Sequence, residues 1–301
     1  MRSRLCLAVW LLALTLATPT MAHDTLVIGR ISDDPKAHYE SMRPMVNYVV
    51  AHMGDLGIVH GRVLMARDAQ QMVSYLRQGK VDWISETAGA AIGLQDRSGA
   101  EFLVRARRGG LYDYHSVFFA RRDSGIDSID DLPGRALGFE HPMSTSAYLV
   151  PAIILLDANL SLAIQSSPLE RPPPNFVGYT FARSESNLVT WVQKGLVDAA
   201  VFSNQDWSDL VADDHRASEQ LVRFHTSEEF PRALELVRPG LAVPIKERLR
   251  ALLLDAHNQA DASAALRAYQ RTERFDAIDA ATLARVNALR EGVRRVRSEI
   301  E

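Results

Sequence analysis

Three hydroxyl side chains in a row, Ser144, Thr145 and Ser146, open an apolar run over residues 147–156. A Ser or Thr at such a place can cap a helix, because its oxygen accepts a hydrogen bond from a free amide of the first turn. A cap needs only one hydroxyl. Three hydroxyls, free amides and the positive end of a helix dipole could together hold an oxyanion. The stretch alone leaves both interpretations open, and caps are the commoner of the two.

Other polar side chains stand where expected strands end. Glu86 follows the stretch 81–85, and Asn204 and Asp206 follow the stretch 198–203. Ligands of open α/β sheets bind in the crevice at the carboxyl ends of the strands. These three residues are therefore candidates for one cleft with the Ser-Thr-Ser step, although a solvated loop would account equally well for any one of them.

Motifs of common enzyme classes are absent from the sequence. It contains no G-x-S-x-G, no H-E-x-x-H, no Walker A loop and no dinucleotide-binding glycine pattern. None of the nine histidines pairs with another at metal-ligand spacing. His115 and Ser116 are adjacent on an expected strand, so they face opposite sides and cannot form a base–nucleophile pair. We therefore expect no catalysis, no cofactor and no bound metal.

The elements that would position these residues alternate between strands and helices. The expected strands are 25–29, 58–66, 81–85, 101–107, 115–121, 135–140, 175–179 and 198–203, with helices over 38–53, 68–79, 87–94 and 186–195 and one from Ser144. The rhythm begins again near residue 135, which predicts two α/β lobes with largely parallel sheets covered by helices. Leu283, Val286, Leu289, Val293 and Val296 recur at helical spacing and predict an amphipathic helix over 276–301, packed on the body.

The chain begins like an exported protein. Arg2 and Arg4 precede an apolar run over residues 5–17, and Ala22 offers a small residue for cleavage, which is typical of a signal peptide over residues 1–22. Cys6, the only cysteine, would leave with that peptide, so we expect a periplasmic protein without disulfides and without membrane insertion. Removing the two arginines from the 34 basic residues leaves 32 against 37 acidic ones. This balance excludes a basic footprint for nucleic acid.

Three longer stretches resemble the periplasmic substrate-binding proteins of phosphonate and phosphite ABC transporters. They are GKVDWISETAGAAIG (79–93), YDYHSVFFARRDSGIDSIDDLPGRALGFEHPMSTSAYLVP (112–151) and SESNLVTWVQKGLVDAAVFSNQDW (184–207), in the order found in that family. The resemblance covers roughly residues 25–275 and implies an α/β fold of the type II periplasmic binding protein class, with two lobes and a ligand cleft between them. The crossings between lobes would fall near 117–123 and 222–232. The first lobe would then comprise residues 23–118 and 228–275, and the second lobe residues 119–227.

The resemblance also implies a binding site. In that family the hydroxyls and amides matching Ser144, Thr145 and Ser146 hold the oxyanion, which makes the anion seat the favoured interpretation of this step. Tyr114 and Ser116 fall on a strand between the lobes. Asn187 falls at the start of a second-lobe helix that faces the cleft.

Two departures from the family pattern bear on the ligand. Ala69 and Glu86 stand where aminoalkylphosphonate binders place tyrosines, and Ser186, next to Glu185, stands where an acidic residue would hold the amino group. Aminoethylphosphonate is therefore not the expected ligand. A glutamate beside a bound anion favours an anion that carries its own proton, such as hydrogen phosphite or a monoprotonated phosphonate.

These observations predict an exported, monomeric solute-binding protein that captures a small oxyanion and passes it to an ABC permease. The alternative is a protein of the same fold that presents its anion to a membrane histidine kinase. Neighbouring genes would separate the two, since a permease and an ATPase accompany a transporter and a kinase accompanies a sensor.

Overall fold

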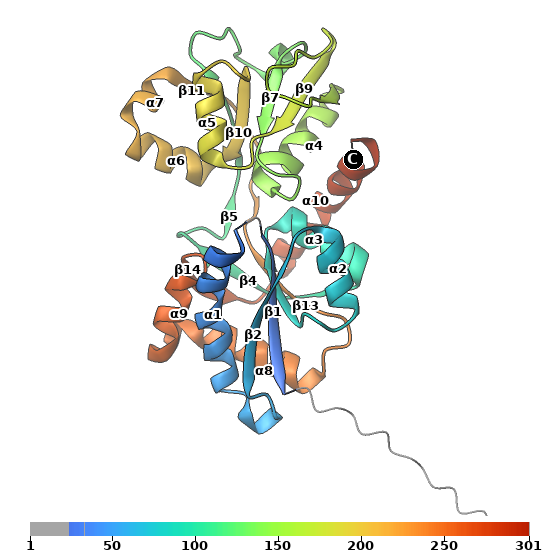
Figure 1. Ribbon diagram of the computed structural model, residues 1–301, viewed down its shortest axis with the longest axis vertical. Coiled ribbons are helices and arrows are strands. Elements are labelled where there is room, and N and C mark those ends of the chain that lie inside the picture. The colour runs from blue at the N-terminus through green and yellow to red at the C-terminus, as the bar shows by residue number, and fades with distance from the viewer. Residues whose placement is uncertain (1–23, 33, 301) are drawn as a thin grey trace, which may run out of the picture.

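The computed structural model describes residues 24–32 and 34–300, which form two α/β lobes stacked along the long axis of the molecule (Figure 1). The signal peptide expected at residues 1–22 lies outside the described residues. Each lobe is built around a six-stranded sheet, and a two-stranded sheet joins them. Among the described residues, no helix combines the length and the apolar character that a membrane span requires.

The first lobe carries a sheet with the strand order β14-β4-β13-β3-β1-β2. Its strands are β1 (Thr25–Ile31), β2 (His60–Ala66), β3 (Trp83–Glu86), β4 (Glu101–Arg108), β13 (Leu234–Val237) and β14 (Thr272–Asp276). Its helices are α1 (Pro35–Ala51), α2 (Ala69–Arg77), α3 (Ala88–Ser98), α8 (Val243–Asp255) and α9 (Ser263–Ala268). Helices α1, α8 and α9 pack on one face of the sheet, and α2 and α3 pack on the other. Both faces are therefore covered, as the alternating pattern predicts.

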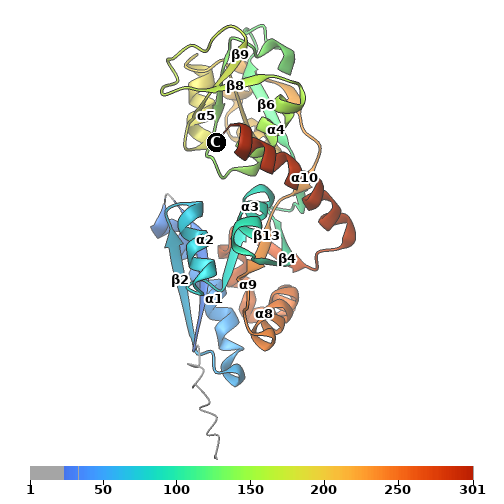
Figure 2. The same ribbon diagram turned by 90° about the vertical axis from the view of Figure 1, so that its right-hand side faces the viewer.

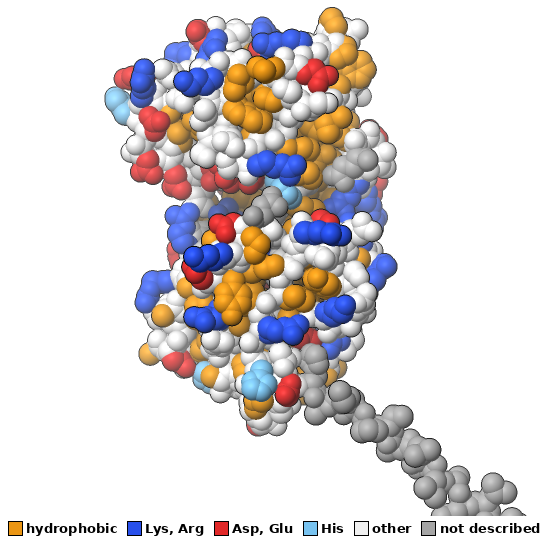
Figure 3. All heavy atoms as spheres, viewed as in Figure 1, with side chains coloured by type: hydrophobic (Ala, Val, Ile, Leu, Met, Phe, Trp, Pro, Cys, Tyr) orange, Lys and Arg blue, Asp and Glu red, His pale blue; other side chains and the backbone are white. Residues whose placement is uncertain are grey.

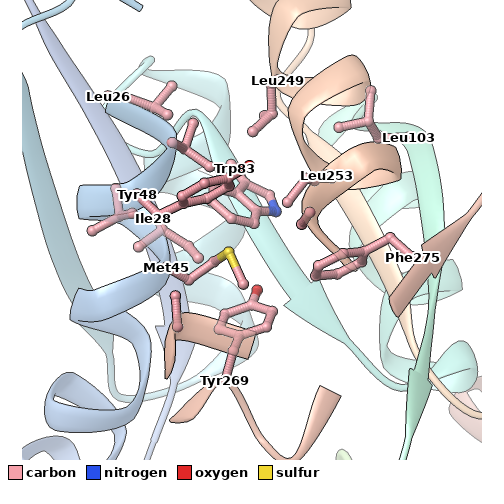
Figure 4. Packing of buried hydrophobic residues seen from close by; sticks show 14 of the residues in the cluster. Leu26, Ile28, Met45, Tyr48, Trp83, Leu103, Leu249, Leu253, Tyr269 and Phe275 are labelled. Atoms are coloured by element: carbon pink, nitrogen blue, oxygen red, sulfur yellow. The ribbon is translucent and has the colours of Figure 1, made fainter. Parts of the chain in front are cut away.

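Helix α1 shows how the sequence builds this core. The carboxylate of Asp34 caps the helix by accepting a hydrogen bond of 3.1 Å from the amide of Ala37. The buried face of the helix, including Met45, packs toward Trp83 and Tyr269, whose ring centroids lie 5.9 Å apart (Figure 4). These aromatic rings fill the centre of the first lobe.

The second lobe carries a sheet with the strand order β11-β6-β10-β7-β9-β8. Its strands are β6 (Ser116–Arg121), β7 (Ala136–Phe139), β8 (Ser161–Ile164), β9 (Phe176–Phe181), β10 (Ala199–Ser203) and β11 (Leu221–Thr226). Its helices are a π-helical turn (Thr145–Leu149) that continues into α4 (Val150–Asp157), followed by α5 (Glu185–Gln193), α6 (Asn204–Asp213) and α7 (His215–Gln220). Short 3₁₀ turns occupy Gly54–Leu56, Ile129–Asp131, Ala256–Asn258 and Ala260–Ala262. Every residue of β7 and β10 is buried, as expected for central strands covered on both faces.

The chain crosses between the lobes at residues 109–115 and 227–233. Within these crossings β5 (Asp113–Tyr114) pairs with β12 (Phe230–Pro231) to form the two-stranded sheet. The first crossing predicted from the sequence, 117–123, is misplaced, because most of it belongs to β6 inside the second sheet. Phe118 and Phe119 are fully buried there, and β6 pairs with both β10 and β11, so this segment cannot be a linker.

Both sheets are mixed rather than largely parallel as the sequence predicts. Parallel pairs join β1 to β2 and β3 in the first lobe, and they join β7, β8, β9 and β10 in the second. The remaining pairs are antiparallel. The crossings explain the difference, because β13 returns from the second lobe and enters between β3 and β4 in the opposite direction.

The last helix, α10 (Ala280–Glu299), lies against both lobes (Figure 2). Its apolar stripe buries Val286, Val293 and Val296, whereas Leu283 is 43% exposed. Arg290 and Arg294 form ion pairs with Asp96 of α3, and Arg295 forms an ion pair with Asp157 of α4. The helix therefore contacts one lobe through α3 and the other through α4.

Candidate functional site

A cavity of about 460 Å³ lies between the lobes, where Figure 3 shows a hollow. Strands β1, β3 and β4 run in the same direction and end at its edge. The first lobe contributes Arg30, Glu86 and Arg108 to its lining, the crossings contribute Tyr114 and Arg232, and the second lobe contributes Glu140, Ser144, Ser146, Glu185 and Asp206. The cavity thus lies where ligands bind in open α/β sheets.

Five of the residues predicted for the site line this cavity, namely Glu86, Tyr114, Ser144, Ser146 and Asp206. Glu86 is 6% exposed, and its Oε1 has no hydrogen-bond partner among the described residues. Burial raises the pKa of the Glu86 carboxyl, and the nearby guanidinium groups of Arg30 and Arg108 oppose this increase. Glu86 is therefore a buried acid with one oxygen free to meet a ligand.

The three hydroxyls of the Ser-Thr-Ser step have three different partners. Ser144 is the N-cap of the π-helical turn and accepts a hydrogen bond of 3.2 Å from the amide of Ala147. The hydroxyl of Ser146 lies within hydrogen-bonding reach of Tyr114. The cap and the second-lobe wall of the cavity are therefore built from one short stretch.

Thr145 does not line the cavity and joins the two lobes. Its Oγ1 accepts a hydrogen bond of 2.9 Å from the amide of Gly89 and donates one of 2.7 Å to Oγ1 of Thr87. A side chain at Gly89 would lie 2.7 Å from Leu149, so this approach of α3 to the second lobe requires a glycine. The structure does not bring Thr145 into the cavity lining, because its hydroxyl is used in this contact.

Ser116, Asn187 and Asn204 also lie outside the cavity lining. The side-chain amide of Asn187 donates a hydrogen bond of 2.7 Å to the carbonyl of Ala182, and Oδ1 of Asn204 accepts one of 3.0 Å from the amide of His115. Ser116 is fully buried within β6, and its hydroxyl has no partner among the described residues. The two amide side chains therefore hold backbone turns beside the cavity.

Arginines form the side of the cavity that the sequence analysis missed. Arg30 directly follows the buried residues of β1, Arg108 ends β4, and Arg232 lies in the second crossing. The Nε atom of each is buried and has no hydrogen-bond partner among the described residues. Like Glu86, Arg30 and Arg108 lie at or near the carboxyl ends of strands. This position predicts a place at the ligand crevice for basic residues as well as for acidic ones.

A buried network holds Arg108 in place. Glu235 of β13 is fully buried and accepts hydrogen bonds of 2.6 Å from Nε1 of Trp83, 2.5 Å from Oγ of Ser85 and 2.9 Å from the hydroxyl of Tyr269. A nitrogen of Arg108 lies 3.3 Å from the same carboxyl group. Four donors fill the acceptor positions of one carboxylate, so Glu235 supports Arg108 as a carboxylate.

Acidic side chains form the opposite side, on the second lobe. Glu140 follows β7, and Glu185 and Asp206 lie in the first turns of α5 and α6. Burial raises the pKa of Glu140 to about 7, and the negative charges of Glu185 and Asp206 act in the same direction. Arg183 also lines the cavity, and its left-handed backbone (φ 69°) is a strained conformation of the kind that clusters at functional sites.

Tyr114 lies between the two charged sides. The guanidinium carbon of Arg232 lies 4.9 Å from the centre of its ring, a cation–π contact. Burial raises the pKa of Tyr114 to about 12, and the charges of Asp206 and Glu140 act in the same direction. Among the described residues, no cluster of three or more His, Cys, Asp or Glu side chains could hold a metal ion.

The chain is similar to known proteins in sequence and in fold. Residues 28–283 match the family model described as ABC transporter, phosphonate, periplasmic substrate-binding protein. A protein from Xanthomonas citri is 40% identical in its structure with bound chloride, which superposes with a TM-score of 0.89 and covers 92% of this chain and 100% of that chain. The structure of the same protein with bound ATP gives 39% identity and a TM-score of 0.88 over the same shares of the two chains.

More distant structures share the fold. The binding-protein component of an ABC phosphonate transporter from Pseudomonas aeruginosa is 22% identical, with a TM-score of 0.67 over 91% of this chain and 87% of that chain. PhnD1 from Prochlorococcus marinus, solved with methylphosphonate, is 14% identical, with a TM-score of 0.70 over 91% of this chain and 98% of that chain. These likenesses confirm the type II periplasmic binding protein fold. The chain therefore belongs to the family of periplasmic substrate-binding proteins of phosphonate ABC transporters, whose members bind a solute for import and are not enzymes.

Proposed function

We propose that the protein captures a phosphate- or phosphonate-type oxyanion in the cavity between its lobes and delivers it to an ABC permease. The observation that carries this proposal is the set of three buried donors, the Nε atoms of Arg30, Arg108 and Arg232, which lack partners among the described residues. A buried N–H without a partner costs free energy, and a charged oxygen would satisfy it. Each of these three arginines lines the cavity and keeps a donor without a partner among the described residues.

The predicted residues that line the cavity would complete the site. We assign ligand contacts to Glu86, Tyr114, Ser144, Ser146 and Asp206 in addition to the arginines. Because the lining comes from both lobes, a bound anion would favour the closed arrangement of the lobes. We further propose that residues 1–22 direct export, that the mature chain acts as a monomer in the periplasm, and that it carries no lipid.

The Xanthomonas citri protein supports an anionic ligand. Its structures are described with bound chloride and with bound ATP, and both ligands are anions. Phosphonates share with ATP a tetrahedral phosphorus that carries charged oxygens. A binding site for such a group is therefore a reasonable inference for a chain that is 40% identical over 92% of its length.

A thermal-shift screen followed by calorimetry tests the proposal. The screen would include phosphate, phosphite, methylphosphonate and ATP, since a ligand at a hundred times its Kd adds about 2.7 kcal/mol of stability. In Arg232→Gln, we expect the anion that stabilises the protein most to bind roughly ten- to a hundredfold more weakly. The reason is that a hydrogen bond to a charged group contributes about 1.5–3 kcal/mol.

A matched control removes the same charge elsewhere. Arg43 is exposed on α1 and lies 5.9 Å from the ring centre of Tyr39, a cation–π contact outside the cavity. Arg43→Gln should leave the affinity unchanged. If no anion of the panel stabilises the protein, or if both variants lose affinity equally, the oxyanion site in this cavity is refuted.

Glu86 should make binding depend on pH. Its raised pKa favours the protonated carboxyl, which can donate a hydrogen bond to an anion. As the pH rises and this proton is lost, the donor becomes a second negative charge and the affinity of the wild type should fall. Glu86→Gln keeps a donor that does not titrate, so its affinity should fall less between about pH 5 and pH 8. Identical pH profiles of the two proteins for one ligand, measured by calorimetry, would remove Glu86 from the site.

A further inference from the structure

The charges that line the cavity are unevenly distributed. Three arginines lie on the first lobe and the second crossing, beside Asp34 and Glu86, whereas three carboxyl side chains lie on the second lobe, beside Arg183. Arg30, Arg108 and Arg232 lie close enough together to repel, since both Arg30 and Arg232 help burial to lower the pKa of Arg108. Arg108 is only 4% exposed, and its Nε lacks a partner among the described residues. Glu86, at 6% exposed, lies on the same side, and its carboxyl can donate a hydrogen bond to an anion when it is protonated. This side of the cavity is a preformed seat for an anion.

The second-lobe side has the opposite character. Burial raises the pKa of both Glu140 and Glu185, and nearby charges add to it: those of Glu185 and Asp206 at Glu140, and that of Asp206 at Glu185. Figure 3 shows carboxylate side chains along the edge of the upper lobe that faces the hollow. An ionised carboxylate only accepts hydrogen bonds. A second anionic group would be repelled here, whereas a group that donates hydrogen bonds would be held.

The room in the cavity exceeds what one tetrahedral anion needs. A cavity of about 460 Å³ falls within the range of roughly 300–1,000 Å³ that is usual for organic ligands of drug size. A phosphate ion would fill only the space of a few water molecules, each of which takes about 30 Å³ in the liquid. The two charged sides also meet at Tyr114, whose ring contacts Arg232 and whose hydroxyl faces Asp206 and Glu140. One extended ligand could therefore reach both sides.

We propose that the ligand is a phosphorylated, hydroxyl-rich organic compound, such as a sugar phosphate or a nucleotide. Its phosphoryl group binds Arg30, Arg108 and Arg232, and its hydroxyls donate to Glu140, Glu185 and Asp206. This assignment rests on the proposed function, because it takes the arginine side as the anion seat. It adds that the acidic side selects the organic part of the ligand.

Calorimetric titration with four probes separates the contribution of the phosphoryl group to the affinity from that of the hydroxyls. Inorganic phosphate offers the anion alone, ribose offers the hydroxyls alone, ribose 5-phosphate offers both, and 2-aminoethylphosphonate pairs an anion with an ammonium group. We expect ribose 5-phosphate to bind at least tenfold more tightly than phosphate, and ribose to bind far more weakly than either. We expect 2-aminoethylphosphonate to bind more weakly than ribose 5-phosphate, because its three N–H donors all lie at one point, whereas the ribose hydroxyls donate from several positions.

Two variants assign the ends of the ligand, and a third is the control. Arg30→Gln should weaken phosphate and ribose 5-phosphate alike, by roughly tenfold or more. Glu185→Gln should weaken ribose 5-phosphate by about tenfold and leave phosphate unchanged. Glu229→Gln removes an exposed carboxylate of the second crossing, outside the cavity, and should change neither.

The outcomes distinguish this inference from the function on which it rests. If phosphate binds as tightly as ribose 5-phosphate, or if Glu185→Gln weakens both equally, the organic part makes no contact with the acidic side and the inference is wrong while anion capture stands. Tighter binding of 2-aminoethylphosphonate than of ribose 5-phosphate would also overturn it, because the carboxylates would then serve an ammonium group. If none of the phosphorus compounds binds, the proposed function fails as well.

Discussion

Glu235→Leu should destabilise the first lobe by about 3–5 kcal/mol, the cost typical of breaking a buried ion pair by removing one partner. The variant leaves the guanidinium of Arg108, which is 4% exposed, without the carboxylate that faces it. It also removes the acceptor for Nε1 of Trp83 and the hydroxyl of Tyr269, two groups of the lobe's core. Urea denaturation, followed by the fluorescence of the tryptophans, would measure the loss.

A double variant separates stability from binding. Arg108→Met combined with Glu235→Leu removes both charges, and such replacements of buried ion pairs are often neutral or stabilising. It should recover most of the stability lost in Glu235→Leu, yet it should bind anions at least tenfold more weakly, because Arg108 lines the cavity. A cost below about 1 kcal/mol for Glu235→Leu alone would mean that the network does not hold a charged Arg108.

The fold was predictable to the extent that local pattern decides it. The first strands and helices, from β1 to α3, lie where alternating apolar runs and helical spacing place them. Strand β13 has only four residues and lies between β3 and β4, which precede it in the chain by more than 120 residues. No local pattern in the sequence indicates that β13 pairs with these two distant strands. The direction of β13, and with it the mixed character of the sheet, depends on where the chain returns from the second lobe.

The site was predictable only where position along a strand decides it. Glu86 and Asp206 could be placed at the cavity because each lies at or just after the carboxyl end of a strand. The partners of Arg108 could not be found in this way, since Glu235 lies 127 residues away in sequence. Thr145 shows a different limit, because a motif indicates that a hydroxyl is important without indicating its partner. In this chain that partner is Gly89 of the other lobe, 56 residues away.

Glu140→Gln should make the protein more stable than the wild type at about pH 8 and equally stable at about pH 5. The pKa of Glu140 rises from its ordinary value of 4.5 to about 7, because the carboxyl is buried and faces the charges of Glu185 and Asp206. The folded protein therefore binds a proton that the unfolded chain releases. Stability from this group is fully present below the unfolded value of about 4.5 and is lost as the pH rises toward 7.

The difference in free energy of unfolding between Glu140→Gln and the wild type measures the contribution of this proton. A shift of this size corresponds to about 3 kcal/mol, at 1.36 kcal/mol for each pKa unit. Gln at position 140 imitates the protonated acid, since its amide can donate to Glu185 without carrying a charge. Urea denaturation at several pH values between about 5 and 8 should give curves that converge at the acidic end and separate at the alkaline end. Groups that do not interact with Glu140 titrate equally in both proteins, and Glu185, which does interact with it, belongs to the same titration. Parallel curves would therefore mean that Glu140 is already ionised throughout this range. The acidic side of the cavity would then carry its full negative charge, and the carboxyl pair of Glu140 and Glu185 would not share a proton.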